Sequence, residues 1–131
     1  MSELEKLFRD YLALGTTDMD GFLGLMHDDI VLEFPYGASA GLKPKLIGRD
    51  EIREGLSGFL ALVPSIRFLD VVVHQSSDPD EAFAVYHANA IVPSTGKTYQ
   101  QDYIAQLRRR DGKVVFFREW FDPVKLISAF N

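Results

Sequence analysis

Glu119 has the most unusual surroundings of any acidic residue in the chain, because aromatic residues crowd both sides of it in the segment FFREWFDP. Burying an unpaired ionised carboxylate is costly, so Glu119 either faces water, forms a structural salt bridge or has a chemical role. A carboxyl group between Phe117 and Phe121 would favour its neutral form, with a pKa of about 6 to 7 that suits proton transfer. An opposing His87 would instead lower that pKa. The segment therefore makes Glu119 a candidate general acid or base, and a structural salt bridge or an outward-facing side chain remains the alternative.

The elements that must position Glu119 follow from hydrophobic periodicity. Residues 2–15 and 17–29 predict two helices, IVLEFP predicts a short strand, and Asp50 and Glu51 begin a third helix after an irregular loop over residues 35–48. Four strands are then expected, over about Ser65–Gln75, Glu81–Val92, Thr98–Arg109 and Val114–Asp122. A helical turn is expected after Pro123. This order indicates an α+β fold, with the helices on one face of a curved antiparallel sheet.

The composition narrows the class of protein. The 131 residues predict a single domain over residues 1–131, and the absence of cysteine excludes thiol chemistry. With a net charge of -5, no long apolar run and an acidic start, we expect a cytoplasmic protein that binds neither nucleic acid nor membranes. The three scattered histidines predict no metal site, and the run Arg108 to Arg110 is interpreted as the solvated end of a hairpin.

Alternation along the last strand gives it two aromatic faces. Phe117, Glu119 and Phe121 share one face and Phe116 and Trp120 the other, so hydrophobicity alone does not decide which face meets the helices. A sheet that is apolar on both sides is usually covered on both. The outer face therefore predicts a homodimer surface, with Tyr86, Phe116 and Trp120 as its anchors.

Three segments, LEFPYG, LIGRDEI and DGKVVFFREWFDP, occur in an order that resembles the SnoaL-like polyketide cyclases and their ketosteroid isomerase relatives. This superfamily is named for nuclear transport factor two, and the resemblance covers nearly the whole chain. It implies a cone-shaped barrel, in which three helices from the N-terminal half pack in a strongly curved, mostly antiparallel sheet. It also implies a deep pocket and a homodimer.

The resemblance transfers only part of the relatives' chemistry. Tyr11 matches the tyrosine that stabilises the oxyanion in ketosteroid isomerase, although it could equally be a core residue. Phe34 and Ala105 stand where that enzyme has its two acids, so its mechanism is not implied. The aspartates and arginine of limonene epoxide hydrolase are also missing, since Gln101 and Tyr103 lie on the corresponding strand.

Glu119 matches the acidic residue that polyketide cyclases and phenazine-biosynthesis A/B proteins carry on the last strand. This alignment turns Phe117, Glu119 and Phe121 inward and predicts His87 and Asn89 on the same side. The predicted catalytic residues are Glu119, His87 and Tyr11, and the predicted substrate-binding residues are Phe34, Asn89, Gln101, Tyr103, Phe117 and Phe121.

Together these residues predict a cofactor-independent isomerase, cyclase or lyase. Its substrate is expected to be a small apolar or aromatic molecule, specifically a cyclic or polyketide-like carbonyl compound. The alternative is a binding or dimeric interaction module of the same fold that has no catalysis. His87 as a histidine that is only hydrogen-bonded in the core also remains open.

Overall fold

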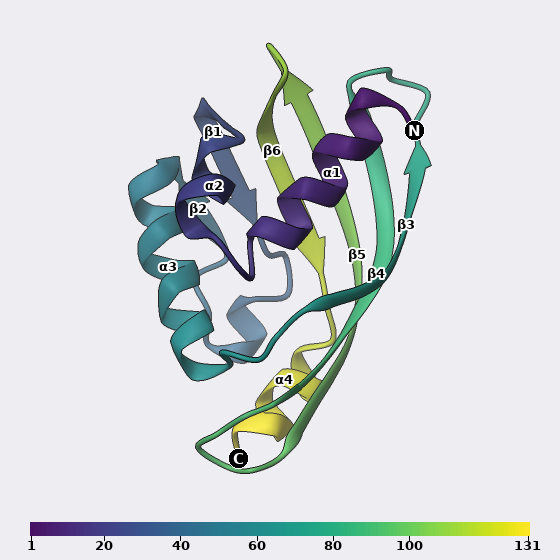
Figure 1. The fold of residues 1–131 in the computed structure, drawn as a ribbon. Helices are drawn as coiled ribbons and strands as arrows, with labels where there is room; N and C mark the ends of the chain where they lie inside the picture. Colours follow the sequence, from purple (N-terminus) through teal and green to yellow (C-terminus); the bar gives the residue numbers. More distant parts are fainter.

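The structure is a computed structural model that describes residues 1–131, and it combines four α-helices with a six-stranded sheet (Figure 1). The helices are α1 (Glu3–Leu14), α2 (Met19–Gly24), α3 (Gly48–Leu62) and α4 (Pro123–Phe130), with a short 3-10 helix at Ala38–Ala40. The strands are β1 (Met26–Glu33), β2 (Lys45–Ile47), β3 (Phe68–Gln75), β4 (Glu81–Ile91), β5 (Thr98–Arg110) and β6 (Lys113–Trp120). No helix is long and apolar enough to cross a bilayer.

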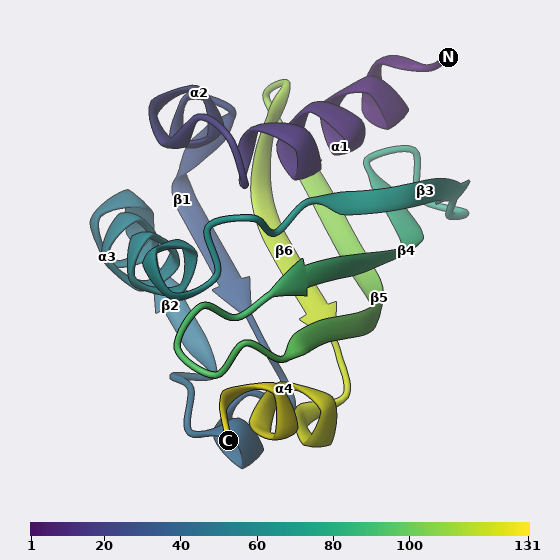
Figure 2. The ribbon, with the colours of Figure 1, turned by 60° about the horizontal axis from the view of Figure 1, so that its bottom comes forward.

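The sheet has the strand order β2-β1-β6-β5-β4-β3, and every neighbouring pair is antiparallel except β1 and β6. It curves strongly around the helices, as Figure 2 shows from a second direction. The predicted α+β class, with helices against a curved and mostly antiparallel sheet, is confirmed. The sheet stays open, because the edge strands β2 and β3 do not pair with each other.

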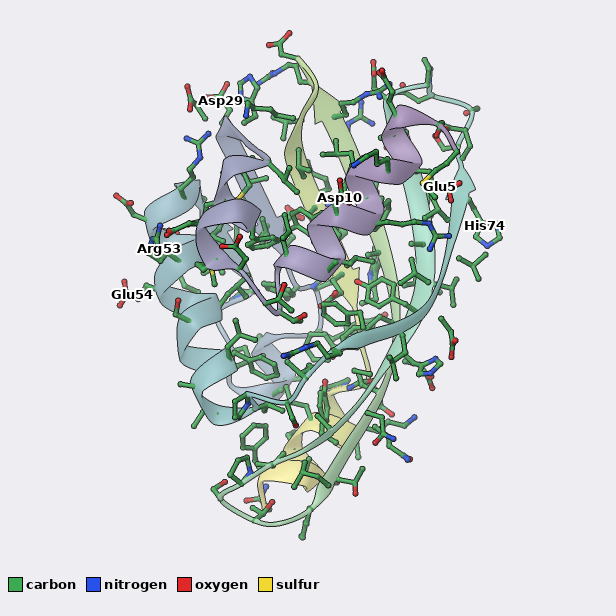
Figure 3. All side chains as sticks on the ribbon, viewed as in Figure 1. Glu5, Asp10, Asp29, Arg53, Glu54 and His74 are labelled. Atoms are coloured by element: carbon green, nitrogen blue, oxygen red, sulfur yellow. The ribbon has the colours of Figure 1, made fainter.

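The first two helices begin at side-chain caps that the sequence provides, whereas α3 begins without one. The Ser2 hydroxyl accepts the backbone N–H of Glu5 at 3.0 Å, and the Asp18 carboxylate accepts that of Gly21 at 3.0 Å. Apolar side chains of α1 and the sheet then join one core of 28 buried residues, in which Phe8 is fully buried. Polar side chains such as those of Glu54 on α3 and His74 on β3 extend away from this core (Figure 3).

Three local predictions need correction. Residues 27–29, expected at a helix end, belong to β1. The start of β1 is next to β6, because the Val114 N–H donates a hydrogen bond to the Leu25 carbonyl at 2.9 Å. The loop over residues 35–48 contains the short strand β2, which pairs with β1. The expected helical turn is the full helix α4, capped by the Asp122 carboxylate.

A β-bulge divides β3 into two parts. Leu69 pairs with His87 and Val72 pairs with Val85, so two residues of β3 lie opposite one residue of β4. Asp70, at the bulge, has a φ of 53°, which lies in the left-handed region that aspartate tolerates better than most residues. The bulge changes which face the following side chains occupy.

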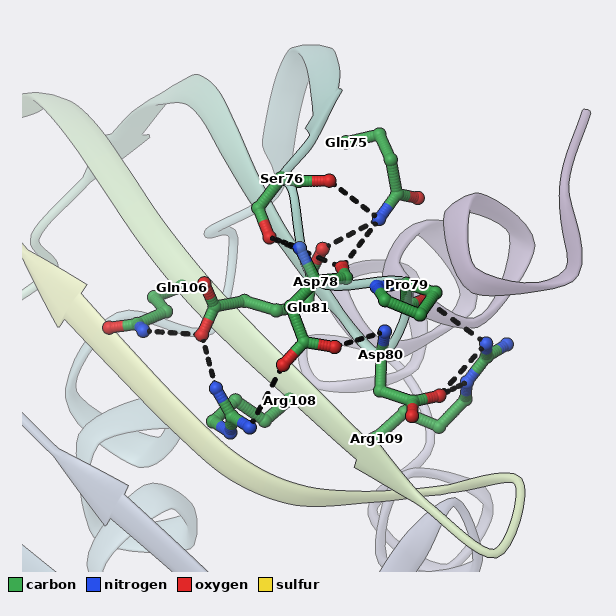
Figure 4. Close-up of polar contacts among 9 residues, drawn as sticks. All are labelled: Gln75, Ser76, Asp78, Pro79, Asp80, Glu81, Gln106, Arg108 and Arg109. Atoms are coloured by element: carbon green, nitrogen blue, oxygen red, sulfur yellow. Dashed lines mark hydrogen bonds and ion pairs between the residues drawn. The ribbon is translucent and has the colours of Figure 1, made fainter.

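The arginine run at the end of β5 is held by ion pairs on the surface. Arg108 contacts Glu81 at 2.6 Å and Arg109 contacts Asp80 at 3.2 Å, in the cluster that Figure 4 shows. Arg110 contacts Asp29 at 2.7 Å. Each of the three cations has a carboxylate partner, so the run carries little uncompensated positive charge.

Candidate functional site

A cavity of about 310 Å³ lies between the helices and the inner face of the sheet. Of its 23 lining residues, 17 are hydrophobic. The hydrophobic residues include three tyrosines that carry hydroxyl groups, Tyr11, Tyr99 and Tyr103, and the other polar side chains are Thr16, Lys43 and Glu119. A mostly apolar cavity with a few convergent polar groups is the usual form of a small-molecule site.

Glu119 is placed in this cavity by the alternation of β6. Its side chain lies on the inner face, opposite Ala105 of β5, and the residue is only 8% exposed. The Tyr86 hydroxyl donates a hydrogen bond to its Oε2 atom. No arginine, lysine or histidine forms an ion pair with it.

Burial dominates the acidity of Glu119. Removal from water raises its pKa to about 7, and the hydrogen bond from Tyr86 opposes this rise without cancelling it. The carboxyl group can therefore hold or release a proton near neutral pH. This is the property that a general acid or base requires.

Tyr86 was assigned to the outer face of the sheet, and this prediction is wrong. It is 2% exposed and lies on the inner face of β4, where its ring stacks on Tyr103 at a centroid distance of 5.2 Å. The two residues are direct partners across β4 and β5, and such partners point to the same face. Tyr103 was predicted to face inward, so its pairing with Tyr86 was the signal that could have shown that Tyr86 faces inward too.

His87 and Asn89 do not lie in the cavity, so their predicted inward orientation is wrong. Alternation on β4 turns both away from Tyr86, and Asn89 is exposed. The Nε2 atom of His87 lies 3.0 Å from the Asp70 carboxylate on the outer face, where the histidine side chain is 41% exposed.

No cluster of three or more potential metal-ligating side chains occurs in the protein.

Tyr11 reaches the cavity from α1 and is 2% exposed. Its ring lies 4.5 Å from that of Phe117. Its hydroxyl has no hydrogen-bond partner, and it is the only buried side-chain polar atom in this condition. Burial, and secondarily the negative charge of Glu119, raises its pKa, so the group remains a neutral hydrogen-bond donor.

Four of the six predicted binding residues line the cavity, and Gln101, like the exposed Asn89, does not. The lining residues are Phe34, Tyr103, Phe117 and Phe121. Gln101 is buried behind the wall, where its amide bonds to the backbone of Asp122 and to the Tyr99 hydroxyl. Its polar atoms are all used within the protein, and it supports the site instead of lining it.

Other lining residues were not identified from the sequence. Phe59 on α3, Phe68 on β3 and Leu126 on α4 all contribute to the wall, as does Lys43 from the loop before β2. The helical period of α3 offered a signal for Phe59, but nothing in the pattern distinguished a cavity wall from a packed core. The exposed Lys43 is 3.5 Å from Glu51, at the end of the cavity formed by this loop.

Comparison with known proteins agrees with this architecture. Residues 5–117 match the family model of the SnoaL-like domain. An uncharacterized PhzA/B-like protein of Pseudomonas aeruginosa is 33% identical over 131 residues, covering 100% of this chain and 92% of the relative.

Solved structures share the fold over nearly the full length. A Bacillus subtilis protein provisionally named an isomerase has 27% identity and a TM-score of 0.88, with 99% of this chain and 96% of that chain covered. An NTF2-like protein of unknown function from Burkholderia pseudomallei has 20% identity and a TM-score of 0.85, covering 100% and 99% of the two chains. The fold is NTF2-like, and the chain belongs to the SnoaL-like domain family.

Proposed function

We propose that the protein is a cofactor-independent enzyme that moves protons on a small, largely apolar carbonyl compound, as an isomerase, cyclase or lyase. The observation that carries the proposal is Glu119, a carboxyl group with a pKa of about 7 that lines an apolar cavity without a cationic partner. A structural carboxylate would be expected to have such a partner or to face water. The provisional name of the Bacillus subtilis relative is consistent with this class of reaction.

The proposed chemistry begins with the carboxylate form of Glu119. Its oxygen takes a proton from the carbon next to a carbonyl group, so the C–H bond breaks, an O–H bond forms and the electron pair moves onto the carbonyl oxygen as an enolate. The unpartnered hydroxyl of Tyr11 is available to donate to that developing charge. Glu119 then returns the proton to the original carbon or to another atom of the same molecule.

Tyr86 has a supporting role in this scheme. Its proton is directed at Oε2 of Glu119, which leaves Oε1 as the oxygen without a protein partner. Tyr86 does not line the cavity, whereas Glu119 does. Tyr86 therefore acts as a positioning residue that holds the carboxyl group and stabilises its ionised form.

Hydrogen–deuterium exchange at the α-carbon of small cyclic ketones tests the proposal directly. The wild-type protein should accelerate exchange in D₂O, and Glu119→Gln should lose this activity while still binding the same ketones. Equal exchange by the two proteins would remove Glu119 from the mechanism. Ketone binding without any exchange by the wild type would indicate a binding module.

We further propose that the outer face of the sheet forms a homodimer. Val72, Val85 and Ile104 lie in one row across β3, β4 and β5, and each is about half exposed, with values of 51%, 46% and 49%. Trp120 continues the row on β6. Such a row of apolar side chains on one sheet face is complementary to itself across a two-fold axis. Tyr86 is excluded from this surface by its burial.

A further inference from the structure

The orientation of the Gln101 amide is determined by its backbone partners. Its Oε1 atom accepts the N–H of Asp122 at 3.0 Å and the N–H of Asp102 at 3.1 Å. Both partners are donors, so this atom must be the oxygen. The other end, Nε2, donates to the Asp122 carbonyl at 2.8 Å and to the Tyr99 hydroxyl at 3.1 Å.

This orientation leaves one phenolic proton unused in the neighbouring tyrosine pair. The hydroxyl oxygens of Tyr99 and Tyr103 are 3.0 Å apart, and either one can donate to the other. Whichever donates, the second proton has no acceptor, because the amide nitrogen of Gln101 only donates. Both tyrosines line the cavity, so the unused proton belongs to a side chain of the cavity wall.

Tyr11 supplies a second unused donor from the opposite side of the fold. It comes from α1, whereas the Tyr99–Tyr103 pair comes from β5, and its hydroxyl has no partner. Neither Tyr11 nor the Tyr99–Tyr103 pair donates to the carboxyl group of Glu119, whose hydrogen bond comes from Tyr86. Donors buried without acceptors are costly, and a ligand that supplies the acceptors recovers that cost.

We propose that the cavity recognises a ring compound carrying two acceptor oxygens, such as a cyclic 1,3-dione. Tyr11 donates to one oxygen and the Tyr99–Tyr103 pair donates to the other. Gln101 is the positioning residue that makes the tyrosine pair a donor. The inference rests on the proposed function, because it names the substrate class on which Glu119 acts.

The two-oxygen class also matches the chemistry of the carboxyl group. A C–H bond between two carbonyl groups is far more acidic than one beside a single carbonyl, and an enolate formed there shares its charge between both oxygens. Two separate donors are then each directed at developing negative charge. A monoketone would leave one buried donor without an acceptor. A polar site rejects such an analogue in favour of the ligand that pairs with both donors.

A matched pair of probes tests the inference. Indane-1,3-dione and 1-indanone share one ring body and differ by one oxygen, and their dissociation constants are measured by calorimetry at pH 6. The dione should bind the wild-type protein about fivefold to tenfold more tightly, as expected for one added hydrogen bond to a buried donor. Equal affinities would overturn the inference, as would failure of both probes to bind.

A double variant connects the preference to the tyrosine pair. Tyr99→Phe combined with Tyr103→Phe should reduce the preference for the dione to less than about twofold. Tyr36→Phe, at an exposed position, is the control. An unchanged preference in a double variant with wild-type near-ultraviolet circular dichroism would contradict the inference. The binding ratio is independent of turnover, so it can fail while Glu119-dependent exchange persists, and the reverse also holds.

Discussion

Tyr86 and His87 are consecutive residues of β4, and each contacts a carboxylate on a different face of the sheet. Tyr86 meets Glu119 inside, where the acid is 8% exposed. His87 meets Asp70 outside, where the aspartate side chain is 80% exposed. The outer pair is therefore in contact with solvent and the inner pair is buried, and this difference in burial decides how each carboxylate responds to its neighbour.

The inner pair has the stronger consequence for chemistry because no solvent compensates the charge of Glu119. Its acidity responds to burial first and to the Tyr86 hydrogen bond second. The outer pair is screened by water, and such exposed ion pairs contribute little to stability. By side-chain type alone, His87 with Asp70 would be a better catalytic candidate than Tyr86 with Glu119. The exposure of the first pair and the burial of the second favour the opposite order.

The largest expected effect concerns turnover. Glu119→Gln should reduce ketone α-proton exchange by about 100-fold or more, the range that general acid–base groups contribute. The matched control His87→Gln should remain within about twofold of the wild type, since its side chain faces the opposite side of the sheet. A large loss of exchange activity in His87→Gln would contradict the conclusion that only the inner face takes part in the reaction.

Stability should respond to pH through Glu119. The folded protein holds its proton up to a pKa of about 7, whereas the unfolded chain releases it near the ordinary value of 4.5. The unfolding free energy should therefore fall as pH rises from about 4.5 to about 7, by about 3 kcal/mol in total.

Urea denaturation at several pH values measures this dependence. In Glu119→Gln the fall should be absent, so that the variant is more stable than the wild type at pH 8. The curve of His87→Gln should retain it. A Glu119→Gln curve parallel to that of the wild type would show that the carboxyl group titrates normally.

The outer face should control association. Lysine in place of Val85 and Ile104 would bury charge in the proposed interface, so the dimer should dissociate at least about tenfold more readily in light-scattering chromatography. Val124→Lys, at an exposed position on α4, is the matched control and should not change the mass. A wild-type protein that is monomeric at all concentrations would reject the dimer.

A smaller effect is expected from Tyr86→Phe. Loss of the hydrogen bond to the carboxylate should shift the acidic limb of the exchange profile upward by about one pH unit, because the ionised form of Glu119 loses its stabilising donor. A variant that affected only packing would lower the rate without moving the profile. Tyr36→Phe should leave both unchanged.

The sequence predicted the fold class and the direction of β5 and β6 well, because their turns and alternating patterns are clear. It misassigned β4, where the small side chains of Ala82, Ala84 and Ala88 face inward and the larger Phe83 and Val85 face outward. The interior there is filled by large rings from neighbouring elements, so the strand supplies small residues. Only the register with β5 reveals this, and register depends on the exact loop geometry between the strands.

Only part of the candidate site could be predicted, because contacts between distant strands also depend on their register. Glu119, Tyr11 and the flanking phenylalanines are recognisable from their local sequence and from resemblance. The hydrogen-bond partner of Glu119 lies 33 residues away in the chain, and Gln101 had no visible reason to be satisfied by the backbone of Asp122. Contacts of this kind arise from the curvature of the sheet, which a pattern of residue types does not contain.

The bulge at Asp70 adds one residue to β3 and so changes which face of the sheet each later side chain occupies. Phe68, before it, and Val73, after it, pair with inward-facing alanines of β4, although four residues lie between them and regular alternation would put them on opposite faces. Without the extra residue, one half of the strand would present its alternate set of side chains, and Phe68 would leave the cavity wall whenever Val73 stayed in the core. Substitutions at position 70 are therefore tolerable where the new residue accepts a left-handed backbone, as asparagine or glycine does. A single-residue deletion would instead change the shape of the cavity itself.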